Sequence, residues 1–379
     1  MGLEILKQED KISVLNIVDN RWWSGSAHFA VYTTKALMEG GYRTAITGDI
    51  KKPAMKIASR EGLNAIGGFN PKPSNPVRYL TELNSLLEII RIGEYRCVIP
   101  HGAQSHYWAG RVKKKLGDSI RVIRALSDDR KPKVNMISKR IYSKWTDGFI
   151  ASSSTLIKKY SKAFNLPDHK FALAIGPFDL DEFNLHYKNE SEKSPNSDIT
   201  FGLIARLSPV KGHTIFLKAA AMALSKNSNL KFLISGEEAQ VKKADLESYA
   251  NDLGISEKVN FTSNYSHPSK PISMIDVGVI SSTFSEVICR IGMEYMASGK
   301  PVISSDINVL PELVIDNVTG IIVPSENVEL LSSAMLKLAE NEDLRKQYGA
   351  EGKKIANDLF TLTAFVNSIK SIIGEEKEE

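Results

Sequence analysis

The stretch from Glu286 to Asp306 reads EVICRIGMEYMASGKPVISSD and contains the unit that is repeated through the chain. Its first half has the apolar spacing of a helix, Gly-Lys-Pro then predicts a tight turn, and a short apolar run predicts a strand. Helix, turn and strand in this order are typical of a parallel sheet covered by helices. The same stretch carries two carboxylates, Glu286 and Glu294, near the start of the predicted helix.

Short apolar runs rich in β-branched residues alternate with helix-period segments on both sides of this stretch. In the first half they start at Ile12, Arg43, Tyr95, Ile120, Thr146 and Lys170, and in the second half at Ile199, Leu230, Lys258, Ile275, Lys300 and Gly320. This alternation predicts βα units and parallel sheets. A chain of 379 residues is also too long for one ordinary core, so we expect two domains.

The predicted fold is therefore α/β, with two Rossmann-like doubly wound domains that face an interdomain cleft. The boundaries follow from residues 187–197, which are polar, contain a proline and lack apolar periodicity, as a linker does. We expect a first domain over 1–186, this linker over 187–197, and a second domain over 198–358. An amphipathic helix within 359–379 is expected to cross back to the first domain and to end in an acidic tail.

Composition excludes several classes of protein. The two cysteines, Cys97 and Cys289, have no CxxC spacing, so neither a disulfide framework nor a thiolate zinc site is indicated. No export signal or apolar run of membrane-spanning length is found, and we expect a cytoplasmic protein. The segment Arg111 to Lys144 holds twelve Lys or Arg against three Asp, nine net positive charges. Such a run is either a solvated face or a surface for anionic lipid or a phosphorylated acceptor, whereas no nucleic-acid motif supports RNA or DNA.

Two carboxylates such as Glu286 and Glu294 could act as the acid and base of a glycosidase. On one helix, eight residues separate them by about 12 Å, more than the roughly 9.5 Å that such a pair spans at most. They could instead hold two parts of one elongated ligand, such as the sugar and the ribose of a nucleotide sugar. Alternatively, Glu286 caps a helix that begins near Val287, and Glu294 is a polar surface position.

Two basic residues in ARLSPVKGH, Arg206 and Lys211, follow the first strand of the second domain. Ligands bind at this end of the strands in doubly wound sheets, and an Arg fork with a Lys point charge suits a departing diphosphate. Residues 179–181 spell Asp-Leu-Asp, but we interpret them as a structural loop and expect no metal. Walker and dinucleotide-binding glycine patterns are absent.

At this point the sequence resembles the retaining, GT-B-fold glycosyltransferases of family four, the glycosyl transferases group 1. The resemblance rests on RLSPVKG (206–212), on the two glutamates with seven residues between them, on EYMASGKPVISSDINVLPELV, and on NVTGIIVP. It implies that the domain over 1–186 binds the acceptor and that the domain over 198–358 binds the nucleotide sugar, with Arg206 and Lys211 holding the donor diphosphate. It further implies that Glu286 contacts the donor sugar and that Glu294 holds the ribose hydroxyls.

The first domain resembles the family more loosely. WWSGSAHF at Trp22 looks like the family's glycine-rich loop, although Ser24 and Gly25 stand where two glycines are usual, and His101 matches the histidine near the reacting sugar. The family often has Glu-Gly-Phe-Gly where this chain has Glu-Val-Ile-Cys. The resemblance implies catalytic roles for His101, Arg206, Lys211 and Glu286. It implies donor contacts at Ser24, Gly25, Arg206, Lys211, Gly236, Glu286, Val287, Ile288, Cys289 and Glu294.

The resulting hypothesis is a retaining enzyme that moves a sugar from a nucleoside-diphosphate sugar to a hydroxyl of a glycan or lipid-linked acceptor, in lipopolysaccharide or surface polysaccharide synthesis. It needs neither a cofactor nor a metal. The segment Arg111 to Lys144 would contact the cytoplasmic face of the inner membrane. Two alternatives stay open: a nucleotide-sugar epimerase on the same fold, and a donor-binding pseudo-transferase without turnover.

Overall fold

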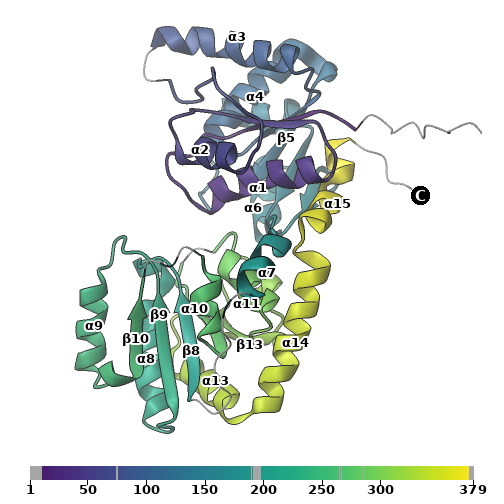
Figure 1. Ribbon diagram of the computed structural model, residues 1–379. Coiled ribbons are helices and arrows are strands. Elements are labelled where there is room, and N and C mark those ends of the chain that lie inside the picture. Colours follow the sequence, from purple (N-terminus) through teal and green to yellow (C-terminus); the bar gives the residue numbers. More distant parts are fainter. Residues whose placement is uncertain are drawn as a thin grey trace, which may run out of the picture. The chain divides into compact units, whose positions relative to one another are not determined.

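The computed structural model describes residues 11–73, 76–188, 190, 198–263, 265, 267–284 and 286–374. Most of the predicted linker and the acidic tail after Gly374 lie outside these residues. The chain divides into two compact units, Met1–Pro177 with Leu362–Glu379, and Phe178–Thr361 (Figure 1). The predicted domain end at residue 186 falls inside helix α7 (Leu180–Lys188), which belongs to the second unit.

The first unit is built on a seven-stranded parallel sheet in the order β3-β2-β1-β4-β5-β6-β7. Its strands are β1 (Val14–Ile17), β2 (Thr44–Thr47), β3 (Ala65–Ile66), β4 (Cys97–Pro100), β5 (Arg121–Leu126), β6 (Gly148–Ala151) and β7 (Phe171–Leu173). Strands β1, β4 and β6 are buried along their whole length, as expected of a sheet covered on both faces. Strand β3 has only two half-buried residues, and the sequence did not predict it.

Helices alternate with these strands, and one comes from the other end of the chain. They are α1 (Gly25–Glu39), α2 (Pro53–Arg60), α3 (Pro76–Ile92), α4 (Ala103–Leu116), α5 (Met136–Lys144), α6 (Ser154–Phe164) and α15 (Leu362–Ile373), with 3-10 turns η1 (Gly117–Ser119) and η2 (Asp168–Lys170). Helix α15 packs on the first unit, where Phe365 meets Phe29 edge to face with ring centroids 5.6 Å apart. The Arg121 guanidinium also donates to the carbonyl of Ile372 at 3.1 Å. The C-terminal segment is thus part of the N-terminal core.

The second unit holds a six-stranded parallel sheet in the order β10-β9-β8-β11-β12-β13. Its strands are β8 (Ile199–Ile204), β9 (Leu230–Ser235), β10 (Val259–Thr262), β11 (Val277–Ile280), β12 (Val302–Ser305) and β13 (Gly320–Val323). After α7 the helices are α8 (His213–Leu224), α9 (Lys243–Asp252), α10 (Ser269–Ser273), α11 (Arg290–Ala297), α12 (Leu310–Leu313), α13 (Val328–Glu340) and α14 (Glu342–Leu359), with 3-10 turns η3 (Pro209–Lys211) and η4 (Ser256–Lys258). All six strands match the predicted apolar runs.

Both sheets reverse their direction of winding beside their first strand. In the first unit β2 and β3 lie on one side of β1 and β4 lies on the other, and in the second unit β8 has β9 and β11 as its neighbours. Such a switch point opens a crevice at the carboxyl ends of the two strands, where ligands of doubly wound sheets bind. The predicted fold class is confirmed, and it places candidate sites after β1 and β4 and after β8 and β11.

Candidate functional site

An ion pair lies at the switch point of the second unit. Lys211 ends the 3-10 turn after β8, and Glu286 lies in the loop after β11. The Lys211 ammonium contacts Oε1 of Glu286, and the Ser282 hydroxyl donates to the same oxygen at 2.6 Å. The Glu286 side chain is only 5% exposed, against 23% for Lys211, so Lys211 is the more exposed partner. Two residues predicted for one ligand are therefore brought together, and Ser282 was not predicted.

The loop before α11 is held by main-chain contacts. The Glu286 amide donates to Oδ1 of Asn308 at 3.1 Å, and the Val309 amide donates to the Glu286 carbonyl at 3.0 Å. The helix itself begins only at Arg290, with Cys289 at its N-cap position. The interpretation of Glu286 as a helix cap is therefore wrong. The helix start predicted near Val287 is wrong for the same reason, because these contacts hold the chain outside the helix.

Glycines allow the backbone around the end of β8 to pack closely. Gly212 has φ +68°, and a Cβ there would lie 1.9 Å from the carbonyl oxygen of Ser281. The Ser281 hydroxyl donates to the carbonyls of Lys211 and Gly212, both at 3.1 Å. At Gly236, after β9, a Cβ would lie 1.9 Å from the carbonyl oxygen of Ala205. Both glycines are explained by close backbone contacts, and those at Gly212 fix the backbone next to Lys211.

Glu294 is buried on α11 and paired within the same helix. It is 2% exposed, and Nε of Arg290 donates to its Oε1 at 2.7 Å. Burial raises the pKa of the Glu294 carboxyl, and the Arg290 guanidinium acts in the opposite direction. The interpretation of Glu294 as a surface position is therefore wrong. Of the neighbouring predicted donor contacts, Val287 and Ile288 are half-buried and Cys289 is buried.

Arg206 and His213 flank Lys211 and differ in exposure. Arg206 follows β8 directly, is exposed, and forms no hydrogen bond or ion pair with the residues that the structure describes. His213 starts α8 and is buried, and burial lowers the pKa of its imidazole to about 4. Its position after Gly212 in the ARLSPVKGH motif was the only signal for it in the sequence. Near neutral pH the cations next to this switch point are therefore Arg206 and Lys211.

His101 lies directly after β4, at the switch point of the first unit. It is 1% exposed, and its Nε2 lies 2.9 Å from Oδ1 of Asn16 on β1. Burial lowers the pKa of His101 to about 3, and the buried Arg124 guanidinium acts in the same direction. The ring is therefore neutral near pH 7. A neutral imidazole can orient a hydroxyl by hydrogen bonding but carries no charge for a phosphate.

Asp19 lies at the same switch point and was not predicted. Its Oδ2 accepts from the Ser105 amide at 2.8 Å, and a Cβ on Gly102 would lie 1.9 Å from its Oδ1. The carboxylate thus occupies the positive N-terminus of α4, a position that otherwise suits a phosphate. Beside it lies a cavity of about 190 Å³, whose charged lining residues are Asp19, Arg21, Asp49, Lys52 and Lys72.

The predicted glycine-rich loop is a helix start in this chain. Ser24 is the N-cap of α1, accepting from the Ala27 amide at 3.4 Å, and Gly25 is the first helical residue. Trp22, in the same loop, is 67% exposed, and the Arg21 guanidinium lies 4.9 Å from its ring centroid. Trp22 is therefore available to a ligand.

Trp108 and the Asp-Leu-Asp stretch are explained by packing and capping. Trp108 is fully buried and donates to the Pro71 carbonyl at 3.0 Å, so it fills the core. Asp179 accepts from the Glu182 amide at 2.9 Å at the start of α7, which gives the Asp-Leu-Asp stretch a structural role. Within the described part of the chain, no group of three or more His, Cys, Asp or Glu could hold a metal ion. No helix among the described residues is long and apolar enough to cross a membrane.

Comparison with known proteins gives a family match in the second unit and fold matches to the whole chain. The family model of glycosyl transferases group 1 matches residues 187–355. Alpha-D-kanosaminyltransferase of Streptomyces kanamyceticus is 26% identical over 175 residues, which is 45% of this chain and 44% of that enzyme. The chain thus spans less than half the length of this curated relative.

Two solved structures resemble nearly the whole chain. Anabaena Alr3699/HepE in complex with UDP has a TM-score of 0.80 at 16% identity, covering 95% of this chain and 99% of that one. The apo form of the lipopolysaccharide outer core galactosyltransferase WaaB has a TM-score of 0.74 at 14% identity, covering 96% and 98%. At these identities the likeness shows the fold alone, and it confirms the predicted GT-B architecture of two Rossmann-like domains.

Proposed function

We propose that this protein is a retaining glycosyltransferase, because its residues 187–355 match the family model of glycosyl transferases group 1. It takes a sugar from a nucleoside-diphosphate sugar and transfers it to a hydroxyl of a glycan or lipid-linked acceptor. The observation that carries this proposal is the contact of Lys211 with Glu286 after β8 and β11. One cation for a diphosphate and one carboxylate for sugar hydroxyls converge where a doubly wound sheet binds its ligand.

The donor diphosphate would bind to Lys211 and to the exposed Arg206. Charge on this diphosphate grows as the bond to the sugar breaks, so cations held there stabilise the transition state more than the ground state. In the proposed step the acceptor oxygen forms the new bond to the anomeric carbon, and the bond from that carbon to the phosphate oxygen breaks. The acceptor proton passes to the leaving phosphate. No protein base is therefore needed, and the neutral His101 would only orient the sugar.

The ribose of the donor would bind to Glu294. This carboxylate is almost fully buried, and its partner Arg290 has a side chain that is 37% exposed. A ribose can reach the carboxylate only if the Arg290 guanidinium shares it or moves outward. Hydrogen bonds to a charged carboxylate are among the stronger ones, so this contact would add to donor affinity.

The acceptor side of the proposal concerns the basic segment Arg111 to Lys144. Around its helix α5, Met136 is 89% exposed, Ile137 62% and Val134 47%. Exposed apolar side chains among cations fit the surface of an anionic membrane. We propose that the enzyme works at the cytoplasmic face of a membrane on a growing lipopolysaccharide or surface polysaccharide. Vesicle flotation tests this part, and binding that does not depend on anionic lipid would contradict it.

The donor assignment is tested by thermal shift and calorimetry with nucleoside diphosphates and nucleotide sugars. A diphosphate at about 100 times its dissociation constant should stabilise the folded protein by about 2.7 kcal/mol, which is readily seen as a shift in the melting temperature. The shift should be lost in Lys211→Ala and kept in Lys218→Ala on α8. The assignment fails if no nucleotide binds, or if both variants respond like the wild type.

Turnover then distinguishes the proposed reaction from its alternatives. Transfer requires an acceptor hydroxyl, whereas an epimerase converts the nucleotide sugar by itself. Consumption of the nucleotide sugar that depends on added acceptor glycan supports transfer. Interconversion without acceptor, or binding without any consumption, would replace the proposal with the epimerase or the pseudo-transferase.

A further inference from the structure

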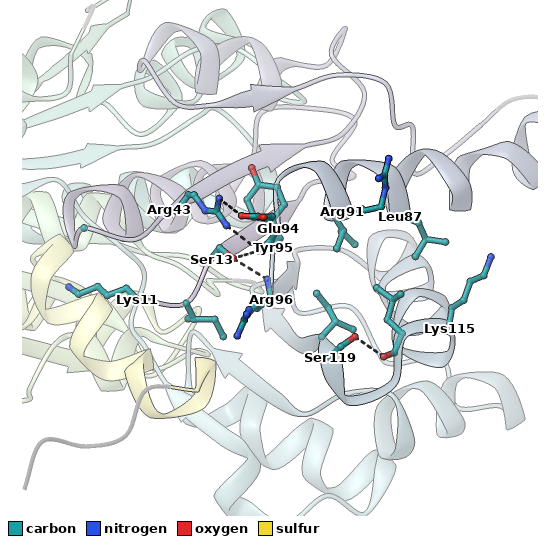
Figure 2. A pocket seen from close by; sticks show the side chains of 15 residues that line it. Lys11, Ser13, Arg43, Leu87, Arg91, Glu94, Tyr95, Arg96, Lys115 and Ser119 are labelled. Atoms are coloured by element: carbon teal, nitrogen blue, oxygen red, sulfur yellow. Dashed lines mark hydrogen bonds and ion pairs between the residues drawn. The ribbon is translucent and has the colours of Figure 1, made fainter. Parts of the chain in front are cut away.

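A large hollow lies on the first unit, at the edge of its sheet where the strands begin. It has a volume of about 1460 Å³, and Figure 2 shows the residues that line it. Ser13 precedes β1, Arg43 precedes β2, Arg96 precedes β4 and Ile120 precedes β5. The candidate site residues His101 and Ser24 follow strands of the same sheet and so lie at its opposite edge. The hollow is therefore separate from the proposed catalytic site.

Positive charge is concentrated around this hollow. Its lining includes five cationic side chains and one carboxylate: Lys11, Arg43, Arg91, Arg96, Lys115 and Glu94. Two of the cations have partners, because Lys11 donates to the Gly40 carbonyl at 2.6 Å and Arg43 contacts Oε2 of Glu94 at 3.3 Å. Helices α1, α3 and α4 all end at this edge, and their terminal carbonyls attract cations. Lys11 contacts such a carbonyl, and Arg91 and Lys115 lie in the last turns of α3 and α4, so this attraction also favours those two cations at this edge.

Three cations remain without such a partner. The side chains of Arg91, Arg96 and Lys115 form no hydrogen bond or ion pair with any residue that the structure describes. All three are exposed around one concave surface. Like charges gathered in this way repel one another, and a bound anion would relieve that repulsion. The surplus of charge in the hollow therefore points to an anionic ligand.

The floor of the hollow is apolar, and its rim is fixed by hydrogen bonds. Ile90, Tyr95 and Ile120 are each at most 6% exposed and form part of its lining. The Ser13 hydroxyl donates to the Glu94 carbonyl at 2.6 Å, and the Arg96 amide donates to the Ser13 carbonyl at 3.0 Å (Figure 2). The turn between α3 and β4 is thus tied to the start of β1. It holds the rim cations on a defined frame rather than on a free loop.

We propose that this hollow binds a phosphate-bearing anion that extends over an apolar or sugar-like body. Arginine forks bind phosphate oxygens in pairs, and a lysine adds a point charge. The volume is larger than one phosphate requires, so the ligand carries several phosphates or a phosphate joined to a larger group. The same chemistry is found in a soluble phosphate ester and in an anionic lipid headgroup.

The test compares two variants with the same loss of charge. Arg91→Gln with Arg96→Gln removes two rim cations that lie outside the basic segment, and Lys56→Gln with Arg60→Gln removes two cations from α2, outside the lining. Tripolyphosphate is titrated calorimetrically into each variant. Loss of two charge-assisted contacts should weaken its binding to the hollow by about tenfold or more, while the α2 control binds like the wild type.

Hydrogen exchange locates the binding, because tripolyphosphate can also bind at the proposed donor site of the second unit. Protection of residues 87–96 and 115–121 that is lost in the rim variant supports the proposal. Protection confined to the second unit would overturn it, and so would equal weakening in both variants. The failure of the donor site would instead appear as a missing response around residues 206–212, which keeps the two outcomes distinguishable.

Vesicles identify the source of the phosphate. Cosedimentation is measured with phosphatidylcholine vesicles containing phosphatidylglycerol, using the wild type, the rim variant and Met136→Asp on α5. Binding that is lost in the rim variant supports a lipid headgroup in the hollow. Binding that is lost only in Met136→Asp belongs to the basic segment, and the hollow is then assigned to a soluble ligand if tripolyphosphate binds there.

Discussion

Replacing Glu286 with glutamine should strengthen nucleoside-diphosphate binding and weaken turnover. In the free protein Lys211 contacts the Glu286 carboxylate, which accepts a second hydrogen bond from Ser282. A glutamine keeps the size and the acceptor oxygen for Ser282 but removes the negative charge. The Lys211 ammonium then has no carboxylate competing with a diphosphate. The repulsion between that carboxylate and the incoming phosphate is removed as well.

The size of the effect follows from this geometry. Two unit charges roughly 6 Å apart repel each other by about 2.8 kcal/mol at an effective dielectric constant of about 20. Because the Lys211 side chain is 23% exposed, solvent reaches the pair. If water and salt halve the repulsion to about 1.4 kcal/mol, the affinity for the diphosphate rises by about tenfold. Turnover should fall by about 10² to 10³, the usual effect of removing one group that stabilises a transition state.

Calorimetry with the nucleoside diphosphate that binds the wild type measures the first effect, and acceptor-dependent release of that diphosphate measures the second. Glu340→Gln on α13 changes the net charge equally at an exposed position and should leave both unchanged. Equal or weaker diphosphate binding in Glu286→Gln would show that Lys211 does not face the diphosphate. Unchanged turnover would remove Glu286 from the site.

Three further changes test the local contacts. Burial lowers the pKa of His101 to about 3, whereas an unfolded histidine titrates near 6.5, so the stability that comes from the neutral ring is complete above about pH 6.5 and is lost by up to about 1.4 kcal/mol per pH unit below it. Melting temperatures measured between pH 7.5 and 5 should therefore fall less steeply for His101→Gln than for the wild type. Equal slopes would contradict this reasoning. Gly212→Ala and Gly254→Ala both place alanine at φ near +70°, but only the first creates a contact of 1.9 Å. In denaturant unfolding, the free energy of unfolding should fall by about 1 kcal/mol for Gly254→Ala and clearly more for Gly212→Ala. Similar losses in the two variants would refute the packing argument. Arg290→Ala removes the guanidinium that pairs with the buried Glu294 carboxylate. Since burial raises the pKa of that carboxyl, the destabilisation should be full at pH 8 and shrink toward pH 5 as the proton binds. A decrease in melting temperature that does not change with pH would argue against the pair.

Much of the fold could be predicted because parallel strands buried on both faces leave an apolar signal in the sequence. The runs at Ile12 and Ile199 became β1 and β8, and the switch points followed from the strand order. Strand β3 was missed because two half-buried residues produce no apolar run. The start of α11 was misplaced because Glu286 is held outside the helix by Asn308, which is 22 residues away. Contacts of that range have no counterpart in local propensity.

Site residues divide in the same way between local and distant signals. The pair of Arg290 with Glu294 has the i,i+4 spacing of a helical ion pair and could have been predicted from the sequence. Asp19 could not, because its partner amide belongs to Ser105, 86 residues further along the chain. A carboxylate after a strand has many explanations until the N-terminus of α4 is seen beside it. Burial of Glu294 likewise depends on the packing of α11 in the second unit.

The replacement of the family's usual glycines by Val287 and Cys289 does not disassemble the candidate site. Glu286 is held by its own amide and carbonyl and by Ser282, and none of these contacts requires a glycine. The loop is also tied to the turn before α8, since the Thr283 amide donates to the Val210 carbonyl at 2.9 Å. Lys211 and Glu286 therefore stay together whatever side chains follow. The bulkier residues change the wall next to the carboxylate, so they bear on which sugar fits there. The pseudo-transferase hypothesis depended on these substituted glycines alone, and it loses that support.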